Sequence, residues 1–537
     1  MRPLLRILAL WRGRALWLLF GLLVSLAAVG AGVSLMVLAG LSLAGWLGGL
    51  IALRVLGPGR VVLRYFERLT THAATFRALT DLRVWFFRGL ARSAAGGLGF
   101  SRAGDVLTRL VADVDTLDGL YLRIIVPLAG ALLLLPALVV LIASRFVALG
   151  LGLGALFAGG AFLLPWLAGA GAAAQGEAVT AASSRVRIAA LDALTGLREV
   201  RSFGAEGRML ARVQACEAGL FAAQRGMAAR TALAGAGSFL CAQLAIIAVL
   251  FAAGADPLFG IAGLLLTVAC FEAAATLPRA GALTAHTSAA ARRVIEAAEQ
   301  PAPVPDPPRP VPLSAGFTLR FEAVHFRWGR DRPQLFDALT LYIPEASRVA
   351  LLGRSGSGKS TLAALALKLA SPDSGRVTLG GTDLSELPAS GVRARIGWLA
   401  QATHLFDDTI RNNLLLARPD ADEAALWAAL DAARIGEMVR ALPEGLESWV
   451  GESGTRFSGG QGRRLALARA LLSPASILIL DEPCAGLDAE TERAFLLTLN
   501  EVAAGRTIIL ISHRLTGVER LDRIWRLSGG RAVAAAG

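Results

Sequence analysis

Residues 353–361 read Gly-Arg-Ser-Gly-Ser-Gly-Lys-Ser-Thr, a glycine-rich run that ends in a lysine and two hydroxyl side chains. An apolar segment precedes the run and a helical pattern follows it, which is the strand–loop–helix setting that this spacing requires. Glycines let backbone N–H groups surround a phosphate at the start of a helix. We therefore expect the run to bind a nucleotide's phosphates and Mg²⁺, the metal through Ser360, with contacts from Gly353, Ser355, Gly356, Gly358, Lys359, Ser360 and Thr361.

A second chemical site follows the apolar run 477–480, whose residues predict a buried strand. Asp481 and Glu482 come directly after this strand. Two carboxylates at a strand end can place one next to a bound metal ion and leave the other to polarise a water molecule. We expect Asp481 to face Mg²⁺ and Glu482 to act on the water that attacks the nucleotide.

A short glycine pair stands before the helical pattern of residues 462–472, in the order Phe457-Ser458-Gly459-Gly460-Gln461. This segment resembles the LSGGQ signature of ABC ATPases, with phenylalanine in the first place. The resemblance implies that Ser458 and Gly460, with Gly459 and Gln461 beside them, reach the ATP bound to a second motor domain. Two such domains then enclose two ATP molecules between them.

Other residues match the same family one by one. The resemblance places Gln401 in the loop that contacts Mg²⁺ and the reacting water, and His513 at the switch position after a strand. Asp488, which follows Gly486 and Leu487, matches the loop that faces the other nucleotide site. Trp328 matches the position where the family stacks an aromatic ring on adenine, and ordinary packing in a strand is the alternative.

Three further stretches are similar to exporters that carry the membrane and motor parts in one chain. Residues 451–454 resemble the loop that reads the partner's coupling helices, and residues 103–115 and 197–206 resemble cytosolic segments of such exporters. The resemblance implies a membrane domain of six transmembrane helices with the type IV ABC exporter fold, fused to an α/β P-loop ABC ATPase domain. Importers are disfavoured, because their membrane and motor parts are normally separate chains.

The composition is typical of a membrane protein. Apolar residues make up 55% of the 537 residues, the mean hydropathy is +0.56, and the long uncharged runs precede residue 280. The net charge of +13 is spread along the chain without an aromatic and basic binding module, so nucleic-acid binding is disfavoured. The four cysteines are scattered without close pairs, which argues against a disulfide framework and a zinc site.

Several apolar runs are long enough to cross a bilayer, at residues 15–38, 124–143, 146–168, 231–253 and 258–277. One more span is needed, because the ATPase must lie on the same side as the arginine-rich N-terminus. We expect this second span to begin at the Gly57-Pro58-Gly59 break and to pass through His72, whereas a start near Leu43 puts His72 in the cytosol. The arginines of the two long connections place them, and the ATPase, inside the cell.

The proline-rich run 301–312 predicts an extended and semi-rigid linker. We therefore divide the chain into a transmembrane domain at 1–300, a linker at 301–313 and an ABC nucleotide-binding domain at 314–537. We expect a multi-pass protein of the plasma (inner) membrane, surrounded by membrane lipids, with its ATPase domain in the cytoplasm.

Arg60, Arg64, Arg68 and His72 recur every four residues and form one polar stripe along a helix. Within a bilayer such charges are costly and mark a functional site, whereas on a cytosolic helix they are solvated, and periodicity leaves both open. Residues 60–77 and 111–123 closely resemble the CydC family of half-exporters. The resemblance implies a heterodimer with a CydD-like half-transporter, export of the small thiols cysteine and glutathione, and a role in cytochrome bd assembly.

The CydC family is also associated with haem. The imidazole of His72 suits an axial iron ligand, and Arg68, one turn away, suits a propionate group. A basic cavity equally suits anionic glutathione, so the sequence leaves open whether haem is a cargo or a regulator. A lipid or drug exporter is a third hypothesis, which the CydC-like segment disfavours. The expected cofactors are ATP and Mg²⁺, with haem as a candidate.

Overall fold

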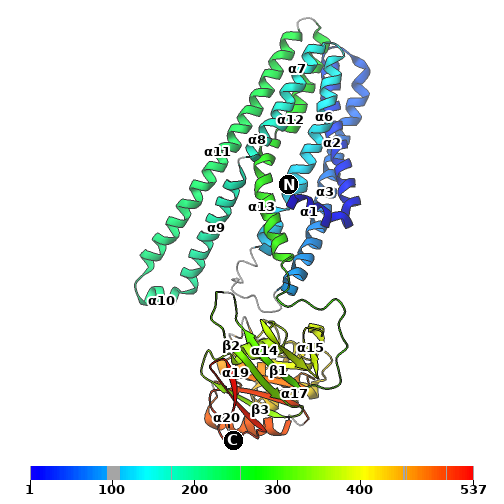
Figure 1. Cartoon of the computed structure of the whole chain (residues 1–537). Coiled ribbons are helices and arrows are strands. Elements are labelled where there is room, and N and C mark those ends of the chain that lie inside the picture. Colours follow the sequence, from blue (N-terminus) through cyan, green and yellow to red (C-terminus); the bar gives the residue numbers. More distant parts are fainter. Residues whose placement is uncertain are drawn as a thin grey trace. The chain divides into compact units, whose positions relative to one another are not determined.

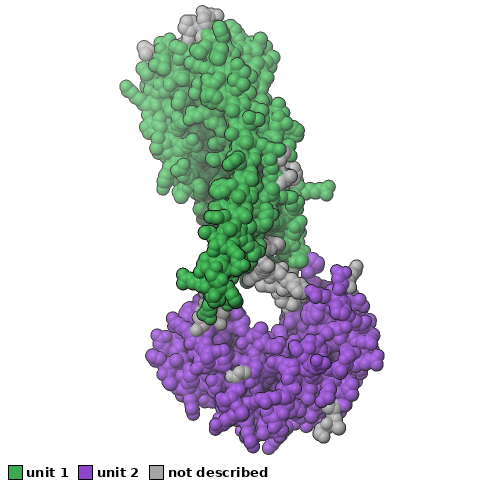
Figure 2. All heavy atoms as spheres, turned by 90° about the vertical axis from the view of Figure 1, so that its left-hand side faces the viewer, with its two compact units in different colours: residues 1–92, 100–300 green, residues 93–99, 301–537 purple. Residues whose placement is uncertain are grey.

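The computed structural model describes residues 2–93, 109–170, 172–253, 256–329, 331–451, 454, 456–485, 487–502 and 505–535. The chain divides into two compact units, one of residues 1–92 and 100–300 and the other of residues 93–99 and 301–537 (Figure 2). The first unit is helical, and the second combines β-sheets with helices. We call them the helical unit and the ATPase-like unit.

The helical unit is a bundle of long helices (Figure 1). Its α-helices are α1 (Arg2–Leu10), α2 (Ala15–Leu43), α3 (Leu50–Ser93), α5 (Val114–Thr116), α6 (Val126–Ala143), α7 (Val147–Ala158), α8 (Leu164–Ala170), α9 (Ala172–Thr195), α10 (Leu197–Ser202), α11 (Glu206–Ala253), α12 (Pro257–Ala274) and α13 (Leu277–Ala298). Among the described residues, five helical stretches are long and apolar enough to cross a membrane: Arg2–Leu43, Val111–Ala143, Val147–Ala170, Glu206–Ala252 and Phe259–Ala298. The apolar runs predicted from the sequence overlap these stretches.

Helix α3 corresponds to the second span expected from the sequence, but it begins at a different residue from the one predicted. The helix begins at Leu50 and continues through Pro58 to Ser93, so the Gly57-Pro58-Gly59 run lies inside it and does not begin it. A proline removes one backbone donor from a helix. In an apolar medium, however, unwinding the helix would leave many more backbone polar groups without partners than the proline does. Membrane helices therefore tolerate proline.

Helices α2 and α3 run antiparallel, and their contacts fix the level of the basic stripe. A β-carbon added to Gly21 would lie 3.4 Å from the Cα of Thr71. Ser25 Oγ donates to Glu67 Oε1 at 3.0 Å. Toward the other end, a β-carbon on Gly32 lies 3.2 Å from Arg60 Nε. Residues 60–72 of α3 therefore lie beside the apolar run of α2, as a bilayer location of the stripe requires.

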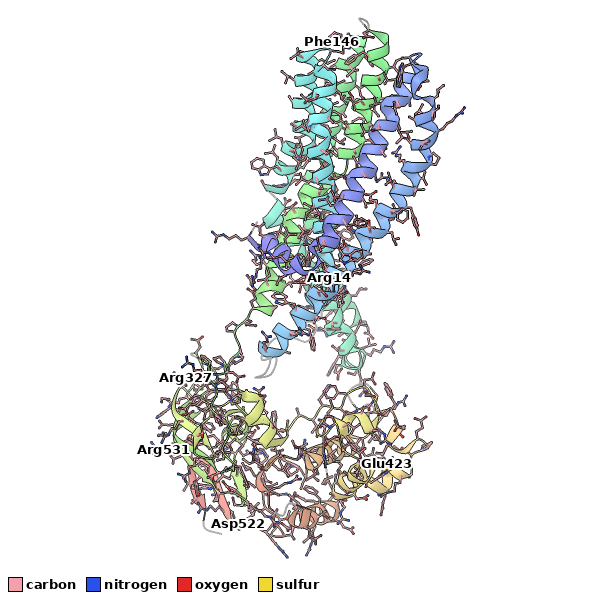
Figure 3. All side chains as sticks on the ribbon, turned by 90° about the vertical axis from the view of Figure 1, so that its right-hand side faces the viewer. Arg14, Phe146, Arg327, Glu423, Asp522 and Arg531 are labelled. Carbon is pink, nitrogen blue, oxygen red and sulfur yellow. The ribbon has the colours of Figure 1, made fainter. Side chains whose placement is uncertain are left out.

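Charged contacts mark one end of this helix pair. Arg14 Nε lies 2.7 Å from Asp81 Oδ2, beyond the level of the stripe. Figure 3 labels Arg14, just before α2, and Phe146, in the turn between α6 and α7, toward opposite ends of the bundle. Because arginine-rich ends of membrane helices stay inside the cell, the Arg14 end is the cytoplasmic one.

The ATPase-like unit is built on two sheets. Their strands are β1 (Leu319–Phe326), β2 (Phe336–Ile343), β3 (Arg348–Gly353), β4 (Ser374–Leu379), β5 (Thr382–Asp383), β6 (Ile396–Leu399), β7 (Ile477–Asp481), β8 (Thr507–Ser512), β9 (Arg523–Ser528) and β10 (Arg531–Ala535). The larger sheet has the order β10-β9-β3-β8-β7-β6, in which β10 alone pairs antiparallel. Its central strands are buried and almost entirely apolar, as expected for parallel strands covered on both faces.

Helices cover this sheet and form a second apolar cluster beside it. They are α14 (Lys359–Ala366), α15 (Ala389–Arg395), α16 (Ile410–Leu415), α17 (Glu423–Ala432), α18 (Gly436–Arg440), α19 (Gly459–Leu472) and α20 (Ala489–Val502). Parallel strands end at the same edge, where α/β proteins bind their ligands. The ends of β3, β6, β7 and β8 therefore define the edge where the candidate site is sought.

The proline-rich linker lies against the ATPase-like unit. Asp306 Oδ1 accepts from the backbone N–H of Ala389 at 2.8 Å and lies 3.6 Å from Lys368 Nζ. The backbone N–H of Val311 donates to Glu386 at 2.9 Å. These contacts fasten the linker to the end of the helix that follows the glycine-rich loop, because Lys368 lies just after α14.

A close approach of α8 and α13 makes one glycine of the helical unit testable. A β-carbon on Gly281 lies 2.0 Å from the carbonyl oxygen of Pro165, so Gly281→Ala must push the two helices apart. We expect this overpacking to cost about 1–3 kcal/mol and to lower the unfolding temperature of the detergent-purified protein. The matched control is Gly219→Ala on exposed α11, where a β-carbon meets nothing within 4 Å. An unchanged unfolding temperature for Gly281→Ala contradicts this packing.

Candidate functional site

The glycine-rich loop joins β3 to α14, as the sequence predicts. Gly356 and Gly358 have φ of +81° and +100°, a region that side chains rarely adopt. At Gly358 there is also no room, since a β-carbon lies 2.5 Å from the ring of Phe336. The loop therefore depends on glycine to turn its backbone N–H groups toward the start of α14.

Lys359 and Ser360 stand at the first positions of α14. Lys359 is 7% exposed, and its Nζ donates to the carbonyl oxygens of Gly353 at 2.8 Å and Arg354 at 3.1 Å. Burial lowers the pKa of Lys359, and the nearby carboxylates of Glu482 and Asp481 oppose that shift. A buried ammonium held among carbonyl oxygens is poised to exchange those contacts for phosphate oxygens.

Asp481 ends β7 and meets Ser360 directly. The Ser360 hydroxyl donates to Asp481 Oδ2 at 2.6 Å. Asp481 is 2% exposed, and its burial raises its pKa while the hydrogen bond from Ser360 opposes the shift. The pair brings together two of the three residues that the sequence assigns to Mg²⁺, the third being Gln401.

Glu482 and His513 are also brought together. Glu482 Oε1 lies 2.7 Å from His513 Nε2, and His513 Nδ1 lies 3.1 Å from the carbonyl oxygen of Gly353. His513 follows β8, the strand between β3 and β7, so the three strand ends supply one constellation. Glu482 itself has φ of +50°, a strained value for a residue with a side chain.

The signature residues form the start of α19. Ser458 Oγ accepts from the backbone N–H of Gln461 at 3.3 Å, and Gln461 Oε1 accepts from the backbone N–H of Ser458 at 2.9 Å. This reciprocal pair is a capping box, which satisfies two backbone donors at the helix start. It fixes Gly459 and Gly460 at the start of α19, where the first backbone N–H groups of a helix have no partner within the helix.

The remaining residues assigned from the sequence take varied positions. Trp328 is half exposed, and its Nε1 donates to Thr361 Oγ1 at 3.0 Å, which ties the aromatic residue to the glycine-rich loop. Asp488 accepts from the backbone N–H of Thr491 and caps α20, and that bond lowers the pKa of Asp488. Gln401 is exposed two residues after β6. Glu452, Gly486 and residues 103–108 lie outside the described residues.

Sequence reasoning missed Arg463, which lies near the start of α19. Its guanidinium donates to the backbone oxygens of Gln401, Asp481 and Glu482. The sequence did carry one signal for Arg463. It lies five residues after Ser458 on an otherwise apolar helix face, and an arginine buried there is costly unless it has hydrogen-bond partners. Its partners come from distant segments, so only the fold could identify them.

The site fits a nucleotide with Mg²⁺. The hydroxyl of Ser357, inside the loop, is buried and makes no hydrogen bond among the described residues, so it is available to a phosphate oxygen. Magnesium is usually held by one or two protein oxygens together with substrate phosphates and water. Ser360 and Asp481 match that donor set, and the described residues hold no cluster of three or more histidine, cysteine or acidic side chains that suits a metal.

A second candidate site lies in the helical unit, along the basic stripe. A cavity of about 930 Å³ is bordered by Arg64, Tyr65, Arg68, His72, Phe76 and Leu122, among others. Glu67 shares the cavity wall, accepts from Ser25 and lies 3.2 Å from Arg64 Nη1. The cavity thus combines positive charge, one partnered carboxylate, an imidazole and two aromatic rings.

Comparisons with known proteins agree with an ATP-driven transporter. A family model described as ABC transporter matches residues 336–485. Over 557 residues the chain is 32% identical to the glutathione/L-cysteine transport system ATP-binding/permease protein CydC of Escherichia coli (strain K12), covering 99% of this chain and 96% of that protein. The chain belongs to the CydC family of ABC transporters.

A further relative and one solved structure are similar to this CydC-family chain along most of its length. It is 31% identical over 491 residues to the protein named CydD of Bacillus subtilis (strain 168), covering 90% of this chain and 85% of that one. It matches the structure of a bacterial Atm1-family ABC exporter with ATP bound at a TM-score of 0.82 and 24% identity, covering 98% and 95% of the two chains.

These findings confirm the predicted family and the predicted ABC exporter fold. The CydC-family chain is a multi-pass membrane protein with a cytoplasmic ATPase domain that couples ATP hydrolysis to transport. The individual roles assigned to Glu482, His513 and the signature residues stay predictions.

The glycine-rich loop provides a direct test of the nucleotide site. Gly358→Ala forces a side chain into a left-handed backbone and against the Phe336 ring. The strain costs about 1–2 kcal/mol and is relieved, together with the clash, when the loop leaves its phosphate-binding conformation, so we expect ATP affinity to fall about tenfold. Equilibrium binding of a fluorescent ATP analogue measures it.

Gly381→Ala is the matched control, because Gly381 has φ of +84° in the turn after β4 but a β-carbon there meets nothing within 4 Å. This variant carries a similar backbone strain outside the loop, so its ATP affinity is expected to stay near that of the unmodified protein. Equal losses in both variants argue against a phosphate-binding role for the loop.

Proposed function

We propose that this chain pairs with a second, CydD-like half-transporter and uses ATP to export the small thiols cysteine and glutathione from the cytoplasm across the inner membrane. The observation that carries the proposal is the end-to-end similarity to the glutathione/L-cysteine transport protein CydC, which includes the membrane half as well as the ATPase domain. The similarity to a CydD protein over most of the chain supports a partner of the same architecture.

The proposed hydrolysis site uses the strand ends described above. Lys359 and the backbone N–H groups of the loop bind the β- and γ-phosphates, and Ser360 with Asp481 holds Mg²⁺. Bound Mg²⁺ supplies positive charge where phosphate charge develops. Glu482 polarises the attacking water and His513, 2.7 Å away, orients that carboxylate, while Gln401 approaches the same water.

The signature of one chain is proposed to complete the site of the other. Ser458 and the N–H groups of Gly459 and Gly460 form a rigid helix terminus, which is suited to a γ-phosphate. Asp488 faces the same junction, and Trp328 stacks on the adenine. ATP binding then draws two ATPase domains together, and hydrolysis releases them.

The proposed substrate region is the cavity along α3. Glutathione is anionic at neutral pH. Arg64 and Arg68 supply positive charge on α3, which lies beside the apolar helix α2. Charges at this depth are costly unless they are partnered or serve a ligand, and Glu67 lies within ion-pair distance of Arg64. The cavity therefore favours a small anionic cargo over a neutral apolar one.

Glu482→Gln tests the proposal. We expect the purified pair, with the Gln substitution in both subunits, to bind Mg-ATP with unchanged affinity but to lose ATP hydrolysis by at least about a hundredfold, because the carboxylate that acts on water is gone from both sites. Inside-out vesicles carrying the variant should accumulate neither cysteine nor glutathione, whereas vesicles with the unmodified pair accumulate at least one of them when ATP is added.

Glu490→Gln is the control, since Glu490 is an exposed carboxylate in the first turn of α20. It should hydrolyse ATP and transport like the unmodified protein. Undiminished ATP hydrolysis in a pair that carries the Gln substitution in both subunits overturns the catalytic assignment. Vesicles that accumulate a lipid or haem but neither thiol overturn the proposed cargo.

Haem binding to the same cavity is a second candidate function. The cavity of about 930 Å³ has an imidazole, basic side chains and aromatic walls, which fits a flat amphipathic dianion. His72 would supply an axial nitrogen ligand and Arg68 would pair with a propionate. His72 lies on the same helix face as Arg68, one turn away, so both reach one bound group. Such binding suits either a cargo or a regulator.

His72→Ala tests this candidate. We expect the purified pair titrated with haem to show a Soret band that shifts on binding, and the variant to lose that shift because the axial nitrogen is missing. His404→Ala, in the ATPase domain, is the control and should behave like the unmodified protein. An identical Soret band in the His72 variant removes the proposed ligand and leaves the thiol proposal intact.

A further inference from the structure

Arg463 contacts the catalytic edge at three backbone positions, although it belongs to none of the sites described above. It is 8% exposed, and its side-chain hydrogen bonds to the described residues all end on backbone oxygens. Nε and Nη2 donate to Glu482 at 2.9 and 2.5 Å, Nη2 also donates to Asp481 at 2.5 Å, and Nη1 donates to Gln401 at 2.6 Å. A planar guanidinium is suited to holding several acceptors in one plane.

The three acceptors are the segments that carry the hydrolytic side chains. Asp481 ends β7 and Glu482 follows it, and Gln401 follows the neighbouring strand β6. Glu482 is held in the left-handed region immediately before Pro483, while its own N–H donates to Ile511 of β8 at 2.9 Å. A strained residue keeps its conformation only when its surroundings hold it. On the carbonyl side, Glu482 accepts from Arg463 and from the backbone N–H of Ala485 at 3.1 Å.

The position of Arg463 on α19 connects this edge to the signature. Ser458 caps α19 and Arg463 follows five residues later, so the helix start and the guanidinium belong to one rigid turn and a half. A displacement of the helix start is therefore transmitted to the backbone of Glu482. Burial lowers the pKa of Arg463, whereas the carboxylates of Glu482 and Asp481 raise it, as expected for a cation kept beside them.

We propose that Arg463 is a positioning residue for ATP hydrolysis, which fixes the backbone of Asp481, Glu482 and Gln401 relative to the signature helix. Its guanidinium donates to backbone oxygens and acts through Glu482, so the proposal rests on the catalytic role proposed for that carboxylate. Because the signature is proposed to serve the ATP of the partner, Arg463 also links the two composite sites through one side chain.

Arg463→Lys is the primary test, since it keeps the charge and removes the planar fork. We expect the purified full-length pair to lose at least about tenfold in kcat for ATP hydrolysis while KM and ATP affinity stay within about twofold. The control is Arg469→Lys, on the same helix, whose guanidinium donates to the single backbone oxygen of His404 at 2.9 Å. Its kcat should stay within about twofold of the unmodified protein.

A double-mutant cycle separates positioning from general stability. If Arg463 acts through Glu482, then adding Arg463→Lys to Glu482→Gln lowers the residual hydrolysis no further. A merely structural role lowers ATP affinity and the unfolding temperature together, in both backgrounds. Arg463→Met, which removes every donor but keeps much of the length, should show a larger kcat loss than the lysine variant.

The outcomes distinguish this inference from the function on which it rests. Arg463→Lys with an unmodified kcat, or with a kcat loss matched by the loss in ATP affinity, overturns the positioning role. Undiminished hydrolysis with the Gln substitution in both subunits overturns the proposed catalytic carboxylate whatever Arg463 does. If Glu482→Gln causes the expected loss but Arg463→Lys lowers the residual hydrolysis further by its full single-variant factor, only the inference about Arg463 is rejected.

Discussion

The hydrogen bond of 2.6 Å from the Ser360 hydroxyl to Asp481 joins residues 121 positions apart, and the nucleotide site depends on it. It forms because β3 and β7 flank β8 in one sheet, so a loop, two carboxylates and a histidine meet at one edge. Burial there raises the pKa of Asp481 and lowers that of Lys359, which means that the fold disfavours both charges. Groups kept under such conditions are typical of functional sites.

The helical unit also keeps charged groups in surroundings that disfavour charge. Its basic stripe lies beside the apolar run of α2, where charge is expensive, and the contacts of Glu67 with Ser25 and Arg64 reduce that cost. Arg68 borders a cavity together with an imidazole and aromatic rings. A basic cavity beside an apolar helix suits a cargo that carries a carboxylate, as both proposed thiols do, better than a purely apolar cargo.

Local patterns predicted the chemical segments well, because spacing within one loop or strand end determines them. The glycine-rich loop, the paired carboxylates after a strand and the glycine pair before a helix all lie where they were expected. The start of the second membrane helix was predicted wrongly, because a proline that breaks helices in water is retained at Pro58 in an apolar setting. Arg463 was not predicted, since its backbone partners lie in distant segments of the chain. The Ser458–Gln461 capping box was not predicted either, although its spacing is a signal that the sequence carries.

The central claim is that the signature of this chain and the phosphate-binding loop of another enclose one ATP. A photoreactive benzophenone side chain in place of Phe457, next to Ser458, tests it most directly in the purified full-length pair. The account predicts a covalent adduct between the two subunits, formed on illumination with Mg-ATP and mapping to the partner's phosphate-binding loop. Adducts confined to this chain, or inter-subunit adducts of equal yield without nucleotide, contradict it.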